Sequence, residues 1–175
     1  MTIEENKRLI SRYPFLQPRN VWTDKISEDY DYSYIRGIGE IPHGWNELFL
    51  QMCEDIREPL IEAGCLHSFR FTQIKEKNNR MCCYCHGAPA AIHDILHKYE
   101  HMAHYVCTHC GKPATHESCS YYASYCKECL NRIVRWEKSV PIKLKTTYKV
   151  IHGFNGVCEE KIVSFEDEWR RLYNL

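Results

Sequence analysis

The sequence predicts an α+β protein in which helices pack on a small antiparallel sheet and a four-cysteine zinc ribbon is inserted. Two stretches carry apolar residues at helical spacing, other stretches alternate like strands, and two Cys-x-x-Cys pairs lie 15 residues apart. We expect a helical and hairpin body over residues 1–104 and a zinc ribbon with a following helix over residues 105–137. Residues 138–175 are expected to form a hairpin and a helix that pack on the body.

Two helices of the body are predicted from their caps and their apolar periodicity. Thr2 and Glu5 form a capping-box pattern, which places the first helix over residues 3–12. The second helix is predicted over residues 45–63, where large apolar residues recur at helical spacing and Gly64 follows as a C-cap. Pro59 is expected to kink or shorten this helix, since proline removes a backbone donor.

A β-hairpin and a third helix complete the predicted body. Residues 66–76 and 81–85 read as paired strands joined by a turn at residues 77–80. We expect Phe69, Phe71 and Gln73 to share one face of the first strand. The third helix is predicted over residues 90–103.

The C-terminal part is predicted to contain one short helix, a hairpin and a last helix. The short helix covers residues 130–137 and is expected to end before Pro141. Strands over residues 142–151 and 157–163 are expected to pair through a turn at residues 153–156. The last helix is expected to be capped by Ser164 and Asp167.

Charge is balanced over the whole chain but not along it. There are 23 Lys and Arg against 23 Asp and Glu, which argues against binding nucleic acid mainly through bulk positive charge. Residues 28–62 hold nine acidic against two basic residues, a net charge of −7, and residues 127–149 hold seven basic against two acidic residues, a net charge of +5. These segments are either two solvated faces that attract each other, or an acidic surface for a basic partner.

The N-terminal residues and the cysteine content favour a cytoplasmic protein. The first six residues are polar and acidic, unlike a signal peptide, and no apolar run reaches the length of a membrane span. The chain has 11 Cys and 10 His, and an odd number of cysteines without a secretory signal is typical of metal ligands or unpaired thiols.

The strongest chemical signal is a predicted site for one structural Zn²⁺ ion. Its ligands are Cys107, Cys110, Cys126 and Cys129, whose spacing matches a zinc ribbon. Two residues between cysteines let the chain turn so that both thiolates face one ion, and Gly111 supplies a permissive backbone. Four thiolates leave no open coordination position, so the zinc is expected to be structural and not catalytic. Four unligated thiols or a redox dithiol are the weaker alternatives.

A second metal site is a weaker hypothesis. Cys82 and Cys85 also form a Cys-x-x-Cys pair, followed by His86. Such a site needs further ligands, and the candidates are Cys119, His109 and His116. The favoured interpretation is that these cysteines are ordinary strand residues.

A histidine stripe on the predicted third helix raises the alternative of a metal-dependent hydrolase. His93 and His97 flank Asp94 in a pattern similar to the HExxH motif of zinc proteases. The shorter aspartate does not reach as far as glutamate, and no third ligand is identifiable. We therefore do not expect an enzyme.

Tyrosines alternate with acidic residues between residues 28 and 34, which suits a protein interaction surface. The alternative is that these rings simply pack on the body. The residues expected to contact a partner are Glu28, Asp29, Tyr30, Asp31, Tyr32 and Tyr34.

Several segments together resemble a family of uncharacterised zinc-ribbon proteins from gut bacteria and their phages. These segments are residues 18–23 (PRNVWT), 28–33 (EDYDYS), 73–77 (QIKEK), 92–95 (IHDI) and 107–115 (CTHCGKPAT). The resemblance covers about residues 1–130. Residues 78–84 depart from the family, which has a glycine-rich hairpin there.

In size and character, a small phage-type protein with one zinc ion and an acidic face also resembles the zinc-containing anti-CRISPR inhibitors of type II RNA-guided nucleases. This resemblance implies a basic protein partner of the kind of a CRISPR-associated nuclease, whose DNA binding or cleavage is blocked. It also implies a location in the cytosol of a bacterium or of a phage-infected host cell. The alternative is a nucleic-acid-binding zinc-ribbon regulator that uses the basic residues 127–149. Direct nucleic-acid binding is not expected, because aromatic residues are sparse there.

Overall fold

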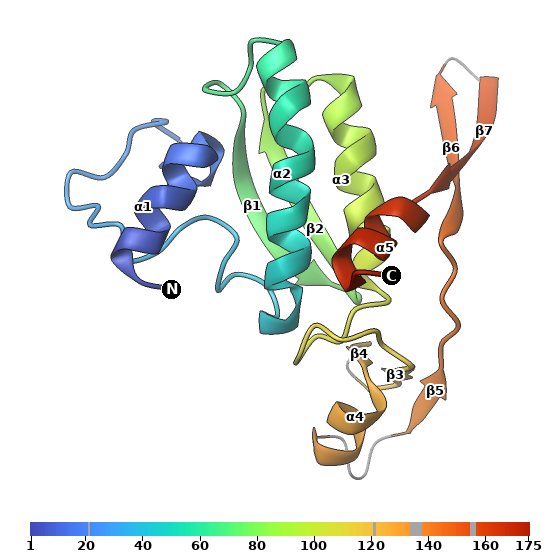
Figure 1. Ribbon diagram of the computed structural model, residues 1–175. Coiled ribbons are helices and arrows are strands. Elements are labelled where there is room, and N and C mark those ends of the chain that lie inside the picture. Colours follow the sequence, from blue (N-terminus) through green and yellow to red (C-terminus); the bar gives the residue numbers. More distant parts are fainter. Residues whose placement is uncertain (21, 121, 134–137, 155–156) are drawn as a thin grey trace.

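The computed structural model describes residues 1–20, 22–120, 122–133, 138–154 and 157–175, with only the backbone described within residues 151–159. The α+β class predicted from the sequence is confirmed, with helices and small antiparallel sheets (Figure 1). No helix among the described residues is long and apolar enough to cross a membrane. The helices and strands are α1 (Ile3–Arg12), α2 (Asn46–Glu62), β1 (Arg70–Lys77), β2 (Arg80–His86), α3 (Ala90–Ala103), β3 (His116–Ser118), β4 (Ser124–Tyr125), α4 (Lys127–Ile133), β5 (Ser139–Pro141), β6 (Thr147–Phe154), β7 (Val157–Ser164) and α5 (Glu166–Tyr173).

The body is built from two helices that lie side by side against the β1–β2 hairpin (Figure 1). The predicted helices α1, α2 and α3 are all confirmed, and the capping box at Thr2 and Glu5 is formed. Pro59 lies inside α2 but does not end it, because Ala63 still donates to the carbonyl of Pro59. The largest fully buried side chains of the core come from α2, from α3 and from segments that follow α1 or precede α2, β1 and α5. They include Trp45, Tyr99, Phe15, Phe49, Phe69 and Phe165.

The hairpin turn is tight because both of its central residues, Asn78 and Asn79, have left-handed backbone angles. The register of β1 differs from the prediction. A bulge between Phe71 and Gln73 shifts the alternation, so that Phe71 and Ile74 are buried while Gln73 is exposed. The expectation that Gln73 shares the face of Phe69 and Phe71 is therefore wrong.

The second half of the chain contains a three-stranded sheet and an extended arm. The strand order is β4-β3-β5, so β5 returns from beyond α4 to pair with β3. Pro141 ends β5 and does not terminate a helix as expected, and α4 begins at Lys127 rather than at residue 130. Residues 134–137 of the predicted helix lie outside the described residues. The expected strand over residues 142–151 begins only at Thr147, and its partner β7 is confirmed.

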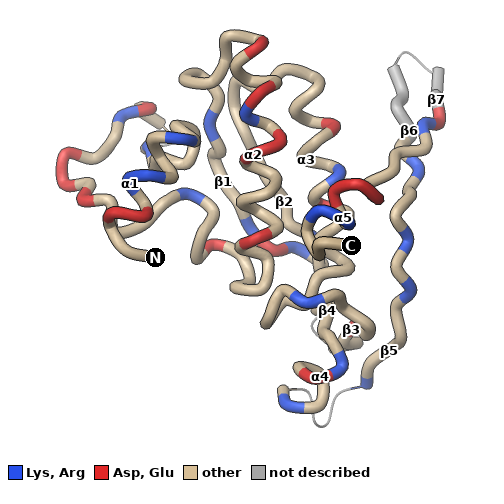
Figure 2. The backbone as a smooth tube through the Cα atoms, viewed as in Figure 1, with Lys and Arg blue, Asp and Glu red and all other residues tan. Residues whose placement is uncertain are grey.

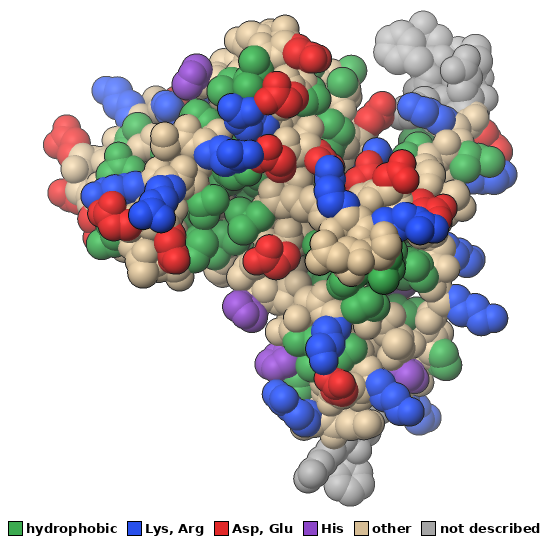
Figure 3. Space-filling view, in the orientation of Figure 1, with side chains coloured by type: hydrophobic (Ala, Val, Ile, Leu, Met, Phe, Trp, Pro, Cys, Tyr) green, Lys and Arg blue, Asp and Glu red, His purple; other side chains and the backbone are tan. Residues whose placement is uncertain are grey.

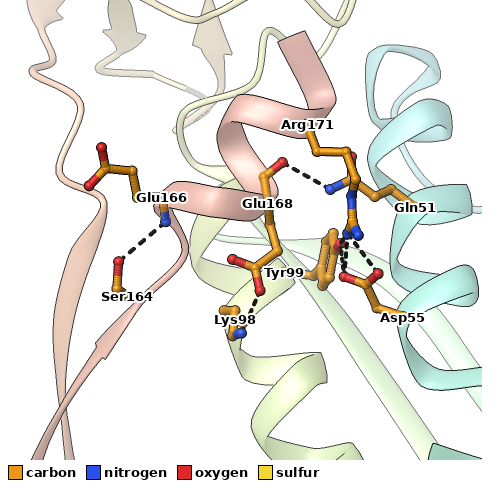
Figure 4. A network of polar contacts seen from close by, with 8 residues as sticks. All are labelled: Gln51, Asp55, Lys98, Tyr99, Ser164, Glu166, Glu168 and Arg171. Carbon is orange, nitrogen blue, oxygen red and sulfur yellow. Dashed lines mark hydrogen bonds and ion pairs between the residues drawn. The ribbon is translucent and has the colours of Figure 1, made fainter. Parts of the chain in front are cut away.

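Helix α5 joins the C-terminal end of the chain to the body through ion pairs (Figure 4). Arg171 donates to both carboxylate oxygens of Asp55 on α2, at 2.6 and 2.5 Å. The same carboxylate accepts a hydrogen bond from Tyr99 on α3. Lys98 on α3 contacts the Glu168 carboxylate at 2.5 Å. These contacts connect α2, α3 and α5 from positions that are distant in sequence.

The charged residues of the described chain are distributed unevenly along the backbone (Figure 2). Acidic residues occur in the loop after α1 and along α2, whereas lysines are spaced along the arm between β5 and β6. In the space-filling view these basic side chains project from one edge of the molecule (Figure 3). Among the described residues, Lys143 and Lys145 in this arm and Lys138 just before β5 pair with no carboxylate, so positive charge is exposed along this edge.

Candidate metal centre

The four predicted zinc ligands come together in space. The sulfur atoms of Cys107, Cys110, Cys126 and Cys129 all lie within 4.8 Å of one another. The Cys110 and Cys126 sulfurs are 3.6 Å apart. A tetrahedral shell with Zn–S bonds of about 2.3 Å places its sulfurs about 3.8 Å apart. The cluster could therefore hold one metal ion, and four thiolate ligands suit zinc.

The first Cys-x-x-Cys pair lies in a tight turn. The Cys107 N–H donates to the carbonyl of Lys112 at 2.8 Å, and the Gly111 N–H donates to the carbonyl of Cys107 at 3.0 Å. Gly111 has a φ of +76°, which explains why glycine follows the second cysteine of this pair. The turn directs both thiols toward the second pair.

The second pair lies at the start of α4, where one helical turn brings its two thiols to the same side. The Leu130 N–H donates to the carbonyl of Cys126, and the Cys129 N–H points at the Cys126 sulfur at 3.5 Å. Burial alone raises the pKa of the Cys126 thiol, but the Cys129 N–H and the neighbouring thiols outweigh it and lower that pKa. A lowered pKa favours the thiolate, which is the form that binds metal.

Hydrogen bonds and an ion pair hold the two Cys-x-x-Cys pairs against each other. Both the backbone N–H and the hydroxyl of Thr108 donate to the carbonyl of Ser124, at 2.9 and 3.1 Å. Lys112 contacts Glu128 at 2.7 Å, and this carboxylate raises the pKa of the lysine. Lys112 also lies near Cys110 and Cys126, so it offsets part of the negative charge of a four-thiolate site.

The cysteine cluster packs directly on the body. The Gly44 N–H donates to the Thr108 carbonyl at 2.9 Å, and the Trp45 ring N–H donates to the Val106 carbonyl at 3.2 Å. A Cβ atom on Gly44 would collide with the Cys107 carbonyl oxygen. From the other end of the chain, the Tyr173 hydroxyl donates to the Gly111 carbonyl at 2.9 Å. The first Cys-x-x-Cys pair therefore lies between the start of α2 and the end of α5.

A buried asparagine forms a further link that the sequence analysis missed. The side chain of Asn79 donates to the Ser124 hydroxyl at 2.6 Å and accepts from the Ser124 N–H at 3.1 Å. That hydroxyl in turn donates to the carbonyl of His104 at the end of α3. Asn79 and Ser124 are both fully buried. The consecutive residues Asn78 and Asn79 predict a turn. No feature of the neighbouring sequence predicts that Asn79 bonds to Ser124, 45 residues away.

The geometry does not assemble the second metal site considered for Cys82 and Cys85. Both residues lie in the extended strand β2, where a separation of three residues spans about 10 Å and reverses the face. Cys82 instead contacts Glu100 on α3 at 3.7 Å, and burial raises the pKa of both thiols. Within the described ranges, the only group suited to a metal ion is the four-cysteine cluster.

The histidine stripe on α3 is divided among different neighbours. His93 is exposed, and His97 lies 3.3 Å from the Glu100 carboxylate, which raises the pKa of that histidine. His101 stacks on Tyr148, with ring centroids 3.8 Å apart, and His104 contacts the Asn79 side chain at 3.0 Å. These histidines do not converge on one point.

The segment expected to contact a partner is partly exposed. Glu28, Asp29 and Asp31 are exposed, and Tyr34 is 55% exposed. Tyr30 and Tyr32 pack against the core as the alternative interpretation expected, with ring centroids 4.8 Å apart. Burial raises the pKa of Tyr30 to about 12, so its hydroxyl stays protonated and donates to the Tyr34 carbonyl.

The acidic face of α2 is partly neutralised by neighbouring arginines. Arg12 forms two hydrogen bonds to the Glu54 carboxylate, at 2.9 and 2.6 Å, and Tyr13 donates to the same carboxylate. Arg12 lowers the pKa of Glu54. Glu58 is paired with Arg57. Uncompensated acidic charge is therefore concentrated more in residues 28–31 than on α2.

Comparisons of the chain with protein-family models, with curated proteins and with solved structures found no match. The resemblance to phage-associated zinc-ribbon proteins stays a prediction. Inference about function therefore depends on the geometry of the cysteine cluster and of the surfaces around it.

Proposed function

We propose that the protein is a zinc-stabilised binding protein and not an enzyme, and that its zinc ion is structural. The observation that carries the proposal is the closed set of four thiols, three of them buried. A catalytic zinc keeps a position open for water or substrate, whereas four thiolates fill the tetrahedral shell. The separated contacts of the α3 histidines favour a binding protein over the alternative hydrolase.

Metal analysis tests the structural zinc directly. Protein purified without added metal is expected to contain about one equivalent of zinc, because four thiolates bind zinc tightly at neutral pH. Replacing the zinc with cobalt makes the coordination number visible in the absorption spectrum. A five-coordinate spectrum, which indicates an exchangeable water on the metal, would contradict a closed site. Two equivalents would restore the second-site hypothesis.

The proposed partner is a basic protein surface, and the proposed contacts are the exposed acids of residues 28–31 with Tyr34. The specific hypothesis is that the protein inhibits a type II RNA-guided nuclease in the cytoplasm of a bacterial host. Its support is the resemblance in size and character, together with the exposed acidic segment. Such nucleases hold their RNA–DNA heteroduplex in a positively charged channel, which an acidic surface could occupy.

A cleavage assay with a panel of type II nucleases tests this partner hypothesis. The triple variant Glu28→Gln, Asp29→Asn and Asp31→Asn should lose inhibition, chiefly through slower association at low salt. The matched control neutralises three exposed acids of α2, with Glu47→Gln, Glu58→Gln and Glu62→Gln, and should inhibit normally. Absence of inhibition across the panel, or equal loss in both triple variants, would remove this hypothesis.

The unpaired lysines of the arm favour a second candidate function, which is binding of nucleic acid by the basic surface. Lys143 and Lys145 are exposed, and no acidic residue occurs from Lys138 to Cys158. We expect only weak, salt-sensitive binding, because the phosphate contacts are few and the net charge of the chain is zero. If nucleic acid instead binds with nanomolar affinity at physiological salt, and the double variant Lys143→Ala with Lys145→Ala abolishes that binding, nucleic-acid binding would rank above protein binding. Arg135 of the same basic stretch lies outside the described residues.

A further inference from the structure

A polar cavity of about 390 Å³ lies in the loop that follows α1, far from the cysteine cluster in sequence. Its lining residues come from two parts of this loop, residues 18–20 with 23–27 and residues 30–36. Figure 1 shows the course of the loop beside α1. The side chains that line it are mainly cationic, hydroxyl-bearing and aromatic, and include Arg19, Lys25, Arg36, Thr23, Tyr30 and Tyr34. Among the lining residues that the structure describes, none is acidic.

The cations of this cavity are incompletely neutralised. Arg19 donates to the backbone carbonyl of Asp24 at 3.1 Å, and in the described part of the chain neither Arg19 nor Lys25 pairs with a carboxylate. The Asp24 carboxylate is held by Arg70 at 2.8 Å. Only Arg36 meets a carboxylate, that of Glu40 at 2.6 Å. The lining therefore carries net positive charge and suits an anionic ligand.

The wall of the cavity also offers aromatic surface. The Tyr30 and Tyr34 rings meet edge to face, 5.6 Å apart, and the Tyr30 hydroxyl is held by the Tyr34 carbonyl at 2.7 Å. Trp22, between the lining residues Asn20 and Thr23, is 91% exposed. Trp22 therefore offers an exposed aromatic ring in the loop that lines the cavity, and such a ring is available for a base to stack on.

We propose that this cavity binds a nucleotide, with its phosphate at Arg19 and Lys25 and its base against Tyr34 and Trp22. An arginine guanidinium matches the oxygens of a phosphate, and an aromatic ring accepts any base by stacking. The cavity volume lies in the range of small-molecule sites. The nucleotide is either free or the phosphorylated end of a single strand. This inference does not depend on the zinc ion. Tyr34 belongs both to the cavity and to the proposed partner contacts, but the test of the cavity does not involve that partner.

Isothermal titration calorimetry with the full-length zinc-loaded protein tests the proposal. The probes are AMP and CMP, adenosine, inorganic phosphate, and a six-nucleotide DNA strand with a 5′-phosphate. AMP or CMP should bind, and adenosine or phosphate alone should bind about tenfold more weakly, since each lacks one half of the contacts. Tighter binding of the strand than of the nucleotides identifies a strand end as the ligand, and equal or weaker binding identifies free nucleotide.

Variants decide whether the cavity is the site. The double variant Arg19→Ala with Lys25→Ala should weaken AMP binding by about tenfold or more, because each charge-assisted hydrogen bond contributes appreciably. Trp22→Ala should weaken AMP but not inorganic phosphate. The matched control Lys143→Ala with Lys145→Ala removes the same charge from the arm and should bind normally. The proposal is overturned if neither nucleotide binds at about 5 mM, if phosphate binds as tightly as AMP, or if both double variants weaken binding equally.

Discussion

The body and the zinc ribbon are stabilised in different ways. The body comprises residues 1–104, and the ribbon comprises residues 105–133 together with strand β5. The body contains a continuous apolar core with aromatic side chains from α2, α3 and β1. The separate buried cluster of the ribbon consists of Cys107, Cys126 and Cys129, with Tyr125 packed beside it. Segments this short bury too little apolar surface to fold alone, so we expect metal ligation at the cysteine cluster to replace the missing core.

This difference predicts which part of the fold depends on the proposed zinc ion. The body needs no metal to bury its apolar side chains, whereas the ribbon has short strands and few buried groups apart from its cysteines. The two parts are nevertheless joined by specific contacts of Gly44 and Asn79. Tyr173 of α5, which lies outside both parts, adds a further contact to the ribbon. Perturbing the metal should therefore affect the ribbon first, and perturbing the joining contacts should affect both parts.

The largest expected effect comes from removing one zinc ligand. Cys126→Ser should abolish stoichiometric zinc binding and unfold the ribbon, since structural zinc contributes about 10–16 kcal/mol to the folding of small zinc modules. The helices α2 and α3 should remain, because their core lies in the body. Metal analysis, together with amide hydrogen exchange resolved by segment, measures both effects.

The matched control for this prediction is Cys119→Ser. Cys119 is exposed and lies outside the four-sulfur cluster, so its variant should keep one zinc ion and wild-type exchange protection. Global unfolding of Cys126→Ser would show that the body also depends on the metal, which would break the distinction between the two parts. Wild-type protection in its ribbon would show that the zinc ion is not structural.

The next largest effect is expected from Gly44→Ala. The added methyl group would collide with the Cys107 carbonyl and lie 2.7 Å from the Gly111 nitrogen, both backbone atoms that cannot rotate away. We expect a loss of about 3 kcal/mol in the free energy of unfolding, the upper end for overpacking. Chemical denaturation measures it. The control Gly64→Ala is strained only by its φ of +65° and should cost about 1 kcal/mol. Equal losses would mean that the ribbon does not pack tightly on the start of α2.

A smaller effect is expected from Asn79→Ala. The change leaves the Ser124 N–H without its buried partner, which costs about 2 kcal/mol. Asn78→Ala is the matched control, because Asn78 shares the turn and a left-handed backbone but is exposed. The difference between the two variants, measured by thermal denaturation, isolates the buried contact from the backbone strain. A difference near zero would indicate that the hairpin does not support the ribbon.

The parts of the fold that were predicted from the sequence are those with local signals. Apolar periodicity identified α2 and α3, the Thr2 and Glu5 pair identified the start of α1, and cysteine spacing identified the metal cluster. Each of these signals is complete within one segment, or in the spacing of two similar motifs. For that reason the α+β class and the four sulfur ligands could be predicted before any contact was known.

The incorrect predictions concern segments whose local structure depends on pairing with residues that are distant in sequence. Pro141 can lie in a strand because β5 is the edge of its sheet, where a missing N–H is tolerated. The bulge in β1 moved Gln73 out of the buried face, and a single inserted residue has no sequence signature. Helix α4 starts earlier than predicted because the second Cys-x-x-Cys pair is itself part of the helix start. The role of Asn79 likewise depends on Ser124, which only the folded chain brings near.

The smallest expected effect is that of Tyr173→Phe, which tests the connection between α5 and the ribbon. The change removes the hydrogen bond from the Tyr173 hydroxyl to the Gly111 carbonyl and leaves the ring packed against Trp169. A net loss of about 1 kcal/mol is expected from one such bond. Because Gly111 follows Cys110 directly, the transfer of zinc to a chelator should also become faster. The control is Tyr122→Phe at an exposed tyrosine, which should change neither the free energy of unfolding nor the rate of zinc transfer. A stability loss without faster zinc transfer would mean that the Tyr173 hydroxyl does not hold the ribbon, and the contacts of Gly44, Trp45 and Asn79 would then be the ones to test next.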